Sequence, residues 1–194
     1  MRMAQRVAVS ALLSMVAVGS VAQAAIVPAM VGVPVANGSN FDWTYRADIG
    51  SDFRVKTGDF FTIYDFGLVQ GHSEPAGWTF STSMLGTNPL AILPNDDPEL
   101  ANVTFTYTGT TPLVGPQDLG LFVLTIISDQ IDTTVPFGAQ ATRNGGTQDG
   151  RFGSDYGALA GPAVPQPGPS IPEPASIGLL AAGIPALLRR RRHA

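Results

Sequence analysis

Residues 41–48 read Phe-Asp-Trp-Thr-Tyr-Arg-Ala-Asp, with apolar and polar side chains in strict alternation. Successive side chains of a β-strand point to opposite faces of its sheet. The stretch therefore predicts a strand with one buried face and one solvated face. Residues 53–56 and 78–81 show the same period of two, and residues 103–108 show it as clearly as the first stretch.

Three further apolar runs extend this β pattern. Residues 60–66 follow a turn at residues 57–59 and are rich in aromatic and β-branched side chains, which favours a strand. Residues 119–127 are apolar at both parities, so we expect a strand that is buried on both faces or lies at a sheet centre. Residues 131–135 continue that strand or pair beside it.

The fold class follows from the spacing of these runs. Clusters of Gly, Pro, Asn and Asp separate them, and residues 25–161 contain no convincing amphipathic helix. Seven to nine short strands with such turns predict an all-β antiparallel β-sandwich, with a jelly roll as the alternative. Residues 25–39, which are small and apolar, form an edge strand or a loose segment. Strand order does not follow from the sequence.

The first 24 residues have the organisation of a secretory signal peptide. Arg2 and Arg6 precede an apolar segment at residues 7–18, and Ala22 and Ala24 form a small-x-small cleavage site. We expect a signal helix that directs export of the chain by the secretion machinery, and we expect signal peptidase to remove it by cutting after Ala24.

The last 23 residues have three parts, Pro172-Glu173-Pro174, an uncharged segment of 14 residues from Ala175 to Leu188, and four arginines. As a helix the segment would measure about 21 Å, which is short for a hydrocarbon core of about 30 Å. The arginines, which also stop transfer, would stay on the cytoplasmic side. They are Arg189, Arg190, Arg191 and Arg192. Residues 162–171 are proline-rich and predict an extended linker in front of a short, temporary transmembrane helix.

This three-part tail resembles the PEP-CTERM sorting signal of exported bacterial proteins. The resemblance covers residues 172–194 and implies recognition of Pro172, Glu173 and Pro174 by exosortase, a membrane-embedded protease or transpeptidase. It also implies transient anchoring in the inner membrane, followed by delivery to the cell surface or to the extracellular biofilm matrix. The alternative is an ordinary membrane anchor that is never processed.

Charge and composition exclude several classes of function. Residues 25–171 contain five basic and fourteen acidic residues, which leaves a net charge of −9. That sign argues against binding to nucleic acid or to an anionic lipid surface. Cysteine is absent from the chain, so the fold has no disulfides and no thiolate chemistry.

No motif predicts an enzyme. His72 is the single histidine of residues 25–171, and we expect it on an exposed loop. A glycan hydrolase would need two carboxylates facing each other across a cleft. The carboxylates open to that role are Asp59, Asp65, Glu74, Asp96, Asp97, Glu99 and Asp118, most of which lie at predicted turns.

Two oxygen-rich loops are candidates for Ca²⁺, the one cofactor that the sequence leaves open. One contains Asp96, Asp97 and Glu99, and the other contains Gln148, Asp149 and Asp155. Calcium accepts such ligands in irregular geometry, but neither loop has the spacing of a calcium-binding loop. Solvated turns are the favoured interpretation of both loops.

Tyr64, Trp78 and Tyr107 could stack on sugar rings if they were exposed, which would indicate a secreted carbohydrate-binding module. Their parity with apolar neighbours favours the core instead. The sequence as a whole therefore predicts an exported, non-enzymatic surface or matrix protein. The exopolysaccharide of such a matrix is a candidate partner, and the ligand of the sandwich is not predicted.

Overall fold

The computed structural model of the protein describes residues 25–163. The predicted signal helix, most of the linker and the sorting signal lie outside these residues. Within them the chain forms twelve strands and a single 3₁₀ turn, η1 (Gly146–Gln148). Over the same residues no helix is long and apolar enough to cross a membrane.

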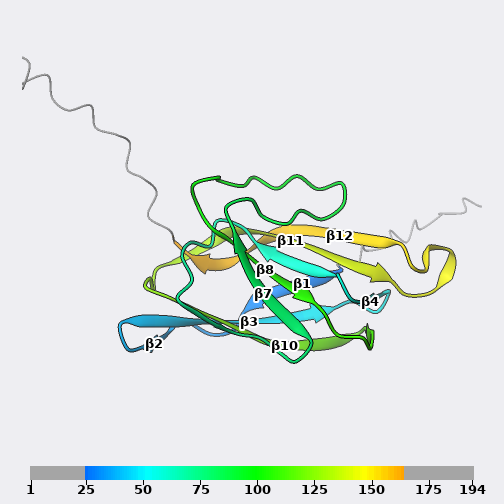
Figure 1. Cartoon of the computed structure of the whole chain (residues 1–194), viewed down its shortest axis with the longest axis horizontal. Coiled ribbons are helices and arrows are strands. Elements are labelled where there is room, and N and C mark those ends of the chain that lie inside the picture. Colours follow the sequence, from blue (N-terminus) through cyan, green and yellow to red (C-terminus); the bar gives the residue numbers. More distant parts are fainter. Residues whose placement is uncertain (1–24, 164–194) are drawn as a thin grey trace, which may run out of the picture.

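The strands form two antiparallel sheets that pack face to face, which confirms the predicted β-sandwich (Figure 1). One sheet has five strands: β1 (Ile26–Met30), β2 (Val35–Asn37), β3 (Asn40–Ile49), β6 (Gly71–Ser73) and β10 (Gln117–Ile126). The other has seven: β4 (Phe53–Val55), β5 (Phe60–Ile63), β7 (Trp78–Ser83), β8 (Asn102–Tyr107), β9 (Leu113–Val114), β11 (Ile131–Arg143) and β12 (Phe152–Pro162).

The core lies between the sheets and is built largely from aromatic rings. Trp43, Tyr45 and Ala47 of β3 are fully buried, as the alternation at residues 41–48 predicts. Phe122 of β10 packs against Phe61 of the opposite sheet with ring centroids 5.0 Å apart at 89°. Edge-to-face pairs of this kind contribute about 0.5–1.5 kcal/mol beyond the area they bury. The aromatic layer thus fixes how the two sheets face each other.

Of the two interpretations of residues 119–127, the position inside a sheet is confirmed, because β10 lies between β3 and β6, whereas burial on both faces is wrong. In β10, Phe122, Leu124 and Ile126 are buried, whereas Leu121 is 53% exposed. The pairing with β3 shifts between Asp118 and Leu121, where Gly120 has a φ of 104°. This bulge changes the parity of the strand, and a β-bulge leaves the extra residue unpaired. Both faces therefore look apolar in the sequence although only one is buried.

The structure also has more strands than the seven to nine expected. The strand predicted at residues 60–66 ends at Ile63, and residues 131–135 open β11, a separate strand in the other sheet from β10. β12 pairs with β11 along nearly its whole length, and the sequence pattern does not indicate it. β12 includes Pro162, which the sequence places at the start of the linker.

A long loop between β7 and β8 crosses the outer face of the seven-stranded sheet (Figure 1). Tyr64 donates its hydroxyl to the Thr87 carbonyl oxygen at 2.9 Å, and Thr62 donates to the same oxygen at 3.0 Å. The loop therefore covers side chains of the sheet that would otherwise face solvent.

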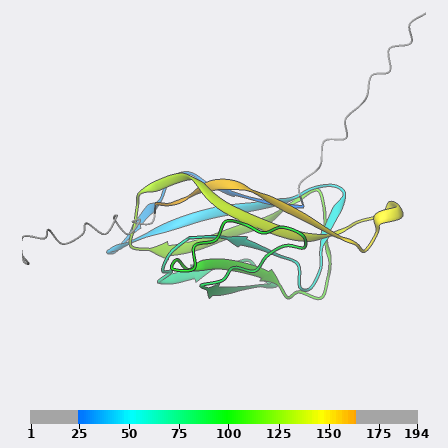
Figure 2. The ribbon, with the colours of Figure 1, turned by 90° about the horizontal axis from the view of Figure 1, so that it is seen from above.

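The described chain begins and ends at opposite ends of the sandwich. β1 starts on the side of the sandwich from which the β11–β12 hairpin projects, and β12 ends at the other end of the long axis (Figures 1 and 2). We call these the hairpin end and the exit end.

Candidate functional site

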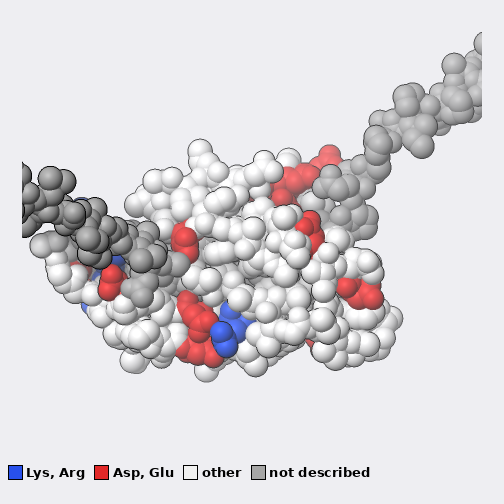
Figure 3. All heavy atoms as spheres, turned by 180° about the vertical axis from the view of Figure 1, so that it is seen from behind, with Lys and Arg blue, Asp and Glu red and all other residues white. Residues whose placement is uncertain are grey.

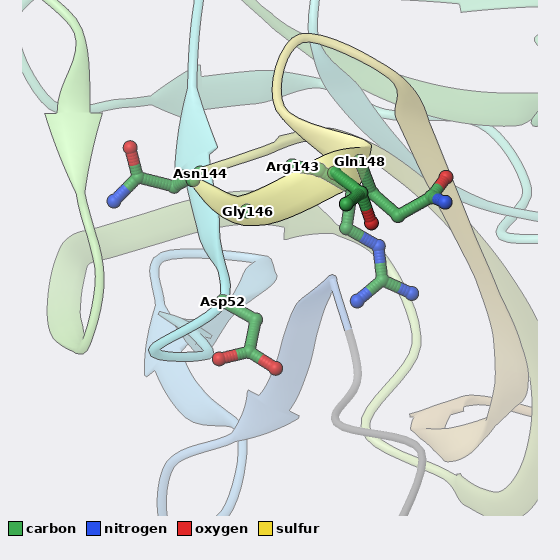
Figure 4. Close-up of a pocket in the computed structure, with 7 residues that line it drawn as sticks. Asp52, Arg143, Asn144, Gly146 and Gln148 are labelled. Atoms are coloured by element: carbon green, nitrogen blue, oxygen red, sulfur yellow. The ribbon is translucent and has the colours of Figure 1, made fainter.

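A polar pocket of about 370 Å³ lies at the hairpin end. Asp52 comes from the turn between β3 and β4, Arg143 is the last residue of β11, and the rest of the lining comes from the loop that follows (Figure 4). The lining residues are Asp52, Arg143, Asn144, Gly145, Gly146, Thr147 and Gln148.

The loop has a defined conformation because several hydrogen bonds hold it. Gly145 and Gly146 adopt φ values of 91° and 65°, which glycine reaches without a steric penalty. The Gly145 N–H donates to the Asp149 carboxylate at 2.8 Å, and the Asn144 N–H donates to the Asp52 carbonyl oxygen at 2.8 Å. The Gly145 N–H and the neighbouring Arg54 charge hold the pKa of Asp149 below its ordinary value.

Arg54 binds two side chains of this loop. Its Nη2 lies 3.1 Å from the Asp149 carboxylate, and its Nη1 donates to the Asn144 side-chain oxygen at 3.2 Å. The Nε of Arg54 is buried and makes no hydrogen bond within residues 25–163. Arg54 is therefore a structural cation that positions the wall of the pocket.

Arg143 is placed differently. Its guanidinium carbon lies 4.3 Å from the centre of the Phe53 ring, an arrangement in which the ring attracts the cation. Within the described residues its side-chain N–H groups donate no hydrogen bond. Figure 4 shows the Arg143 guanidinium and the Asp52 carboxylate turned toward one open space, while the amides of Asn144 and Gln148 point to opposite sides. The pocket thus offers oriented donors and an acceptor that face each other.

Positive charge gathers at the hairpin end of an otherwise acidic domain. Four of the five basic residues of the described chain lie there: Arg54, Lys56, Arg143 and Arg151. Figure 3 shows the face turned away in Figure 1, where acidic side chains are spread along the sandwich and basic ones are few. The hairpin end therefore holds most of the basic residues of the described chain, together with the carboxylates of Asp52 and Asp149.

The exit end carries a second hollow, of about 590 Å³, lined by three carboxylates together with Pro162 and Ala163. Each carboxylate already accepts a hydrogen bond. Asp65 accepts the Asp97 N–H at 2.8 Å, Asp97 accepts the Glu99 N–H at 2.9 Å, and Asp132 accepts the Thr134 N–H at 2.8 Å. Burial raises the pKa of Asp65, whereas the Thr134 donors lower the pKa of Asp132. The Asp97 and Asp132 bonds, each to the N–H two residues along the chain, are typical of turns.

The structure does not assemble the predicted calcium ligands. Asp96 accepts hydrogen bonds from the Asn102 side chain at 2.8 Å and from the Gly86 N–H at 3.0 Å, so it fastens the β7–β8 loop. Asp149 pairs with Arg54, and Asp155 lies within β12 opposite Ala139. Across residues 25–163 no group of three or more His, Asp or Glu side chains is suited to a metal ion.

The sequence pattern favours the core for Tyr64, Trp78 and Tyr107, and the structure confirms it; the alternative of an exposed aromatic platform is wrong. Tyr64, Trp78 and Tyr107 are 0%, 5% and 4% exposed. Tyr64 lies beneath the β7–β8 loop, and the rings of Trp78 and Tyr107 pack together in the core with centroids 5.4 Å apart. A sugar ring cannot stack on any of them.

The remaining sequence-predicted polar residues have structural partners. His72 is exposed as expected, but it lies on β6, stacks on Phe80 with ring centroids 4.0 Å apart, and contacts Glu74 at 2.8 Å. Asp118 accepts the Gly120 N–H at 2.7 Å, which holds the bulge of β10. Asp59 is buried and fastens β11, so neither carboxylate faces a partner across a cleft.

The predicted processing residues lie outside the described part of the chain. They are Ala22, Ala24, Pro172, Glu173, Pro174 and Arg189 to Arg192. Comparison with protein-family models and with curated proteins gives no match to the chain. The polar pocket was missed in the sequence because Asp52 and Arg143 are 91 positions apart and no motif joins them.

Proposed function

We propose that the chain is an exported, non-enzymatic protein that exosortase processes at its C-terminal signal and delivers to the cell surface or extracellular matrix. The three-part tail at residues 172–194 carries this proposal, and the signal peptide at residues 1–24 agrees with it. The tail is too short for a comfortable permanent span, which suits an anchor that is later removed.

The architecture of the sandwich supports such a role. Because β12 ends at the exit end, a C-terminal anchor would tether that end, and the hairpin end would face away from the membrane. The hollow at the exit end is lined by Asp65, Asp97 and Asp132. Negative charge there would disfavour contact with anionic headgroups.

The engagement of the carboxylates supports the absence of catalysis. Asp65, Asp97 and Asp132 share a hollow, but each accepts hydrogen bonds from its own or an adjacent turn. A hydrolase instead needs one carboxylic acid and one carboxylate aimed at the same bond. The arrangement supports a non-enzymatic role.

The test replaces Glu173 by alanine in a bacterium that contains an exosortase and follows the protein in membrane and medium fractions. We expect the E173A variant to stay in the membrane fraction at full length, while wild type is released. The matched control is E99A, which makes the same change on an exposed turn of the sandwich. Normal release of E173A would contradict recognition of the motif. Release of wild type from an exosortase-deficient strain would contradict processing by exosortase.

A further inference from the structure

We propose that the pocket formed by Asp52, Arg143 and the β11–β12 loop binds a carboxylate-bearing saccharide, namely a uronic acid unit of an acidic polysaccharide. This inference goes beyond sorting and does not rest on processing by exosortase. It rests on the pocket, on the unused donors of Arg143 and on the charge at the hairpin end.

The first step concerns what Arg143 can bind. A guanidinium is planar, always charged and able only to donate hydrogen bonds, in a fork that matches a carboxylate. Contact with the Phe53 ring at 4.3 Å restricts the side chain before any ligand arrives. Less freedom is then lost on binding, which favours affinity. The part of the ligand that meets Arg143 must therefore accept hydrogen bonds and carry negative charge.

The second step concerns Asp52, whose ionised carboxylate can only accept hydrogen bonds. Its carboxylate accepts a long hydrogen bond of 3.4 Å from the Ser51 hydroxyl. A ligand that fills the space between Arg143 and Asp52 must place a donor opposite Asp52. A highly charged anion such as a phosphate would be repelled there. A uronic acid carries a carboxylate and hydroxyl donors on one ring. Its carboxylate can accept hydrogen bonds from Arg143 while a hydroxyl donates to Asp52.

The third step concerns size and surroundings. The volume of about 370 Å³ lies near the lower limit of ligand pockets, which run from about 300 to 1,000 Å³. Lys56 and Arg151 add positive charge at the same end, and Arg54 is already paired with Asp149. The basic residues of the hairpin end favour the approach of an anionic chain even though the protein as a whole is acidic. The pocket also lies far from the exit end, where a tethered chain would leave it accessible.

The test is isothermal titration calorimetry of the full chain, purified in mild detergent, against oligogalacturonate of four to six sugar units. A neutral galactose oligomer of the same length and sodium acetate are the comparison ligands. We expect binding of the oligogalacturonate, at least tenfold weaker binding of the neutral oligomer, and no measurable binding of acetate at equal concentration. Equal binding of the neutral oligomer would overturn the role of the carboxylate, and equal binding of acetate would overturn the role of the saccharide.

Two variants locate the binding in the pocket. R143Q should weaken oligogalacturonate binding at least tenfold, because it removes a charged, two-pronged partner. R143K keeps the charge but not the planar fork, and should weaken binding several-fold. The control R46Q removes the fifth basic residue, on β3, which pairs with Asp48 at 3.1 Å, and should leave binding unchanged.

Unchanged binding by both Arg143 variants would overturn the proposal, as would an equal loss in R46Q. If R143Q proves unfolded by circular dichroism, the comparison of R143K with R46Q decides alone. Absence of binding by folded wild type would likewise overturn the proposal, whatever the outcome for processing.

Discussion

Asp59 provides the sharpest test of how the fold supports the pocket. It is 1% exposed, and one oxygen of its carboxylate accepts three hydrogen bonds. The Lys56 N–H donates at 2.8 Å, the Thr142 N–H at 3.1 Å and the Thr142 hydroxyl at 3.0 Å. Asp59 thereby joins the turn after β4 to β11 immediately before Arg143. The perturbation is its replacement by alanine, with asparagine as the partner variant.

The expected cost follows from the donors that alanine leaves behind. Thr142 is 2% exposed, so its N–H and hydroxyl would both lose their acceptor in a buried place. Each such group costs about 1–3 kcal/mol, and the Lys56 N–H can turn to water. We therefore expect D59A to lower the free energy of unfolding by about 2–5 kcal/mol, a large share of the ~5–15 kcal/mol of a typical domain. Asparagine keeps an acceptor, so D59N should lose less than half as much.

The pH dependence has a definite sign. Burial raises the pKa of Asp59 above its ordinary value of 3.8 in the folded state, although its hydrogen bonds act in the opposite direction. The folded protein then holds this proton more tightly than the unfolded chain does. Stability from Asp59 is thus fully present below pH 3.8 and declines as the pH rises through the folded-state pKa. D59N lacks this contribution, so wild type should gain stability relative to D59N as the solution is acidified.

The assay is urea unfolding of the full chain in detergent, followed by the fluorescence of the buried Trp43 and Trp78, from pH 7 down to pH 3. An unfolding free energy of D59A within 1 kcal/mol of wild type would refute the view that Asp59 fastens β11. A difference between wild type and D59N that is constant with pH, or that shrinks in acid, would refute the sign of the pKa shift.

Two further predictions concern the core and the missed strand. Tyr45 has a fully buried hydroxyl with no hydrogen-bond partner within residues 25–163. Y45F should therefore leave the urea midpoint unchanged or raise the free energy of unfolding by up to about 2 kcal/mol. A loss above 1 kcal/mol would indicate a partner such as a buried water. A Cβ atom at Gly153 would collide with the Phe53 ring, so G153A should lower the free energy of unfolding by about 1–3 kcal/mol. The control A158S, at an exposed position of the same strand, should lower it little. Equal losses in the two variants would contradict this packing of β12.

Sequence pattern predicted those parts of the fold in which side chains alternate. The period of two at residues 41–48 and 103–108 corresponds to β3 and β8, because each of these strands has one face in the core. β12 was missed for the opposite reason. Its inward positions include Gly153 and Gly157, which leave room for the Phe53 and Phe137 rings, so the strand has no apolar period to detect.

The candidate site could not be predicted because tertiary structure creates it. Arg143 matters because Phe53, from a different strand, lies beneath it and because Arg54 already neutralises Asp149. The oxygen-rich loop at Asp96 and Asp97 looks like a metal site in the sequence, yet its oxygens accept hydrogen bonds from Asn102, Gly86 and Glu99. Composition alone does not distinguish a carboxylate oxygen that is available to a metal ion from one that accepts hydrogen bonds within a loop.

The most direct test of the proposed function is the intact mass of the protein recovered from the culture medium of a producing strain. We predict one species that begins at Ala25, ends close to Pro172 and lacks the four arginines. Recovery of a secreted form that still contains His193 and Ala194 would contradict processing at the C-terminal signal.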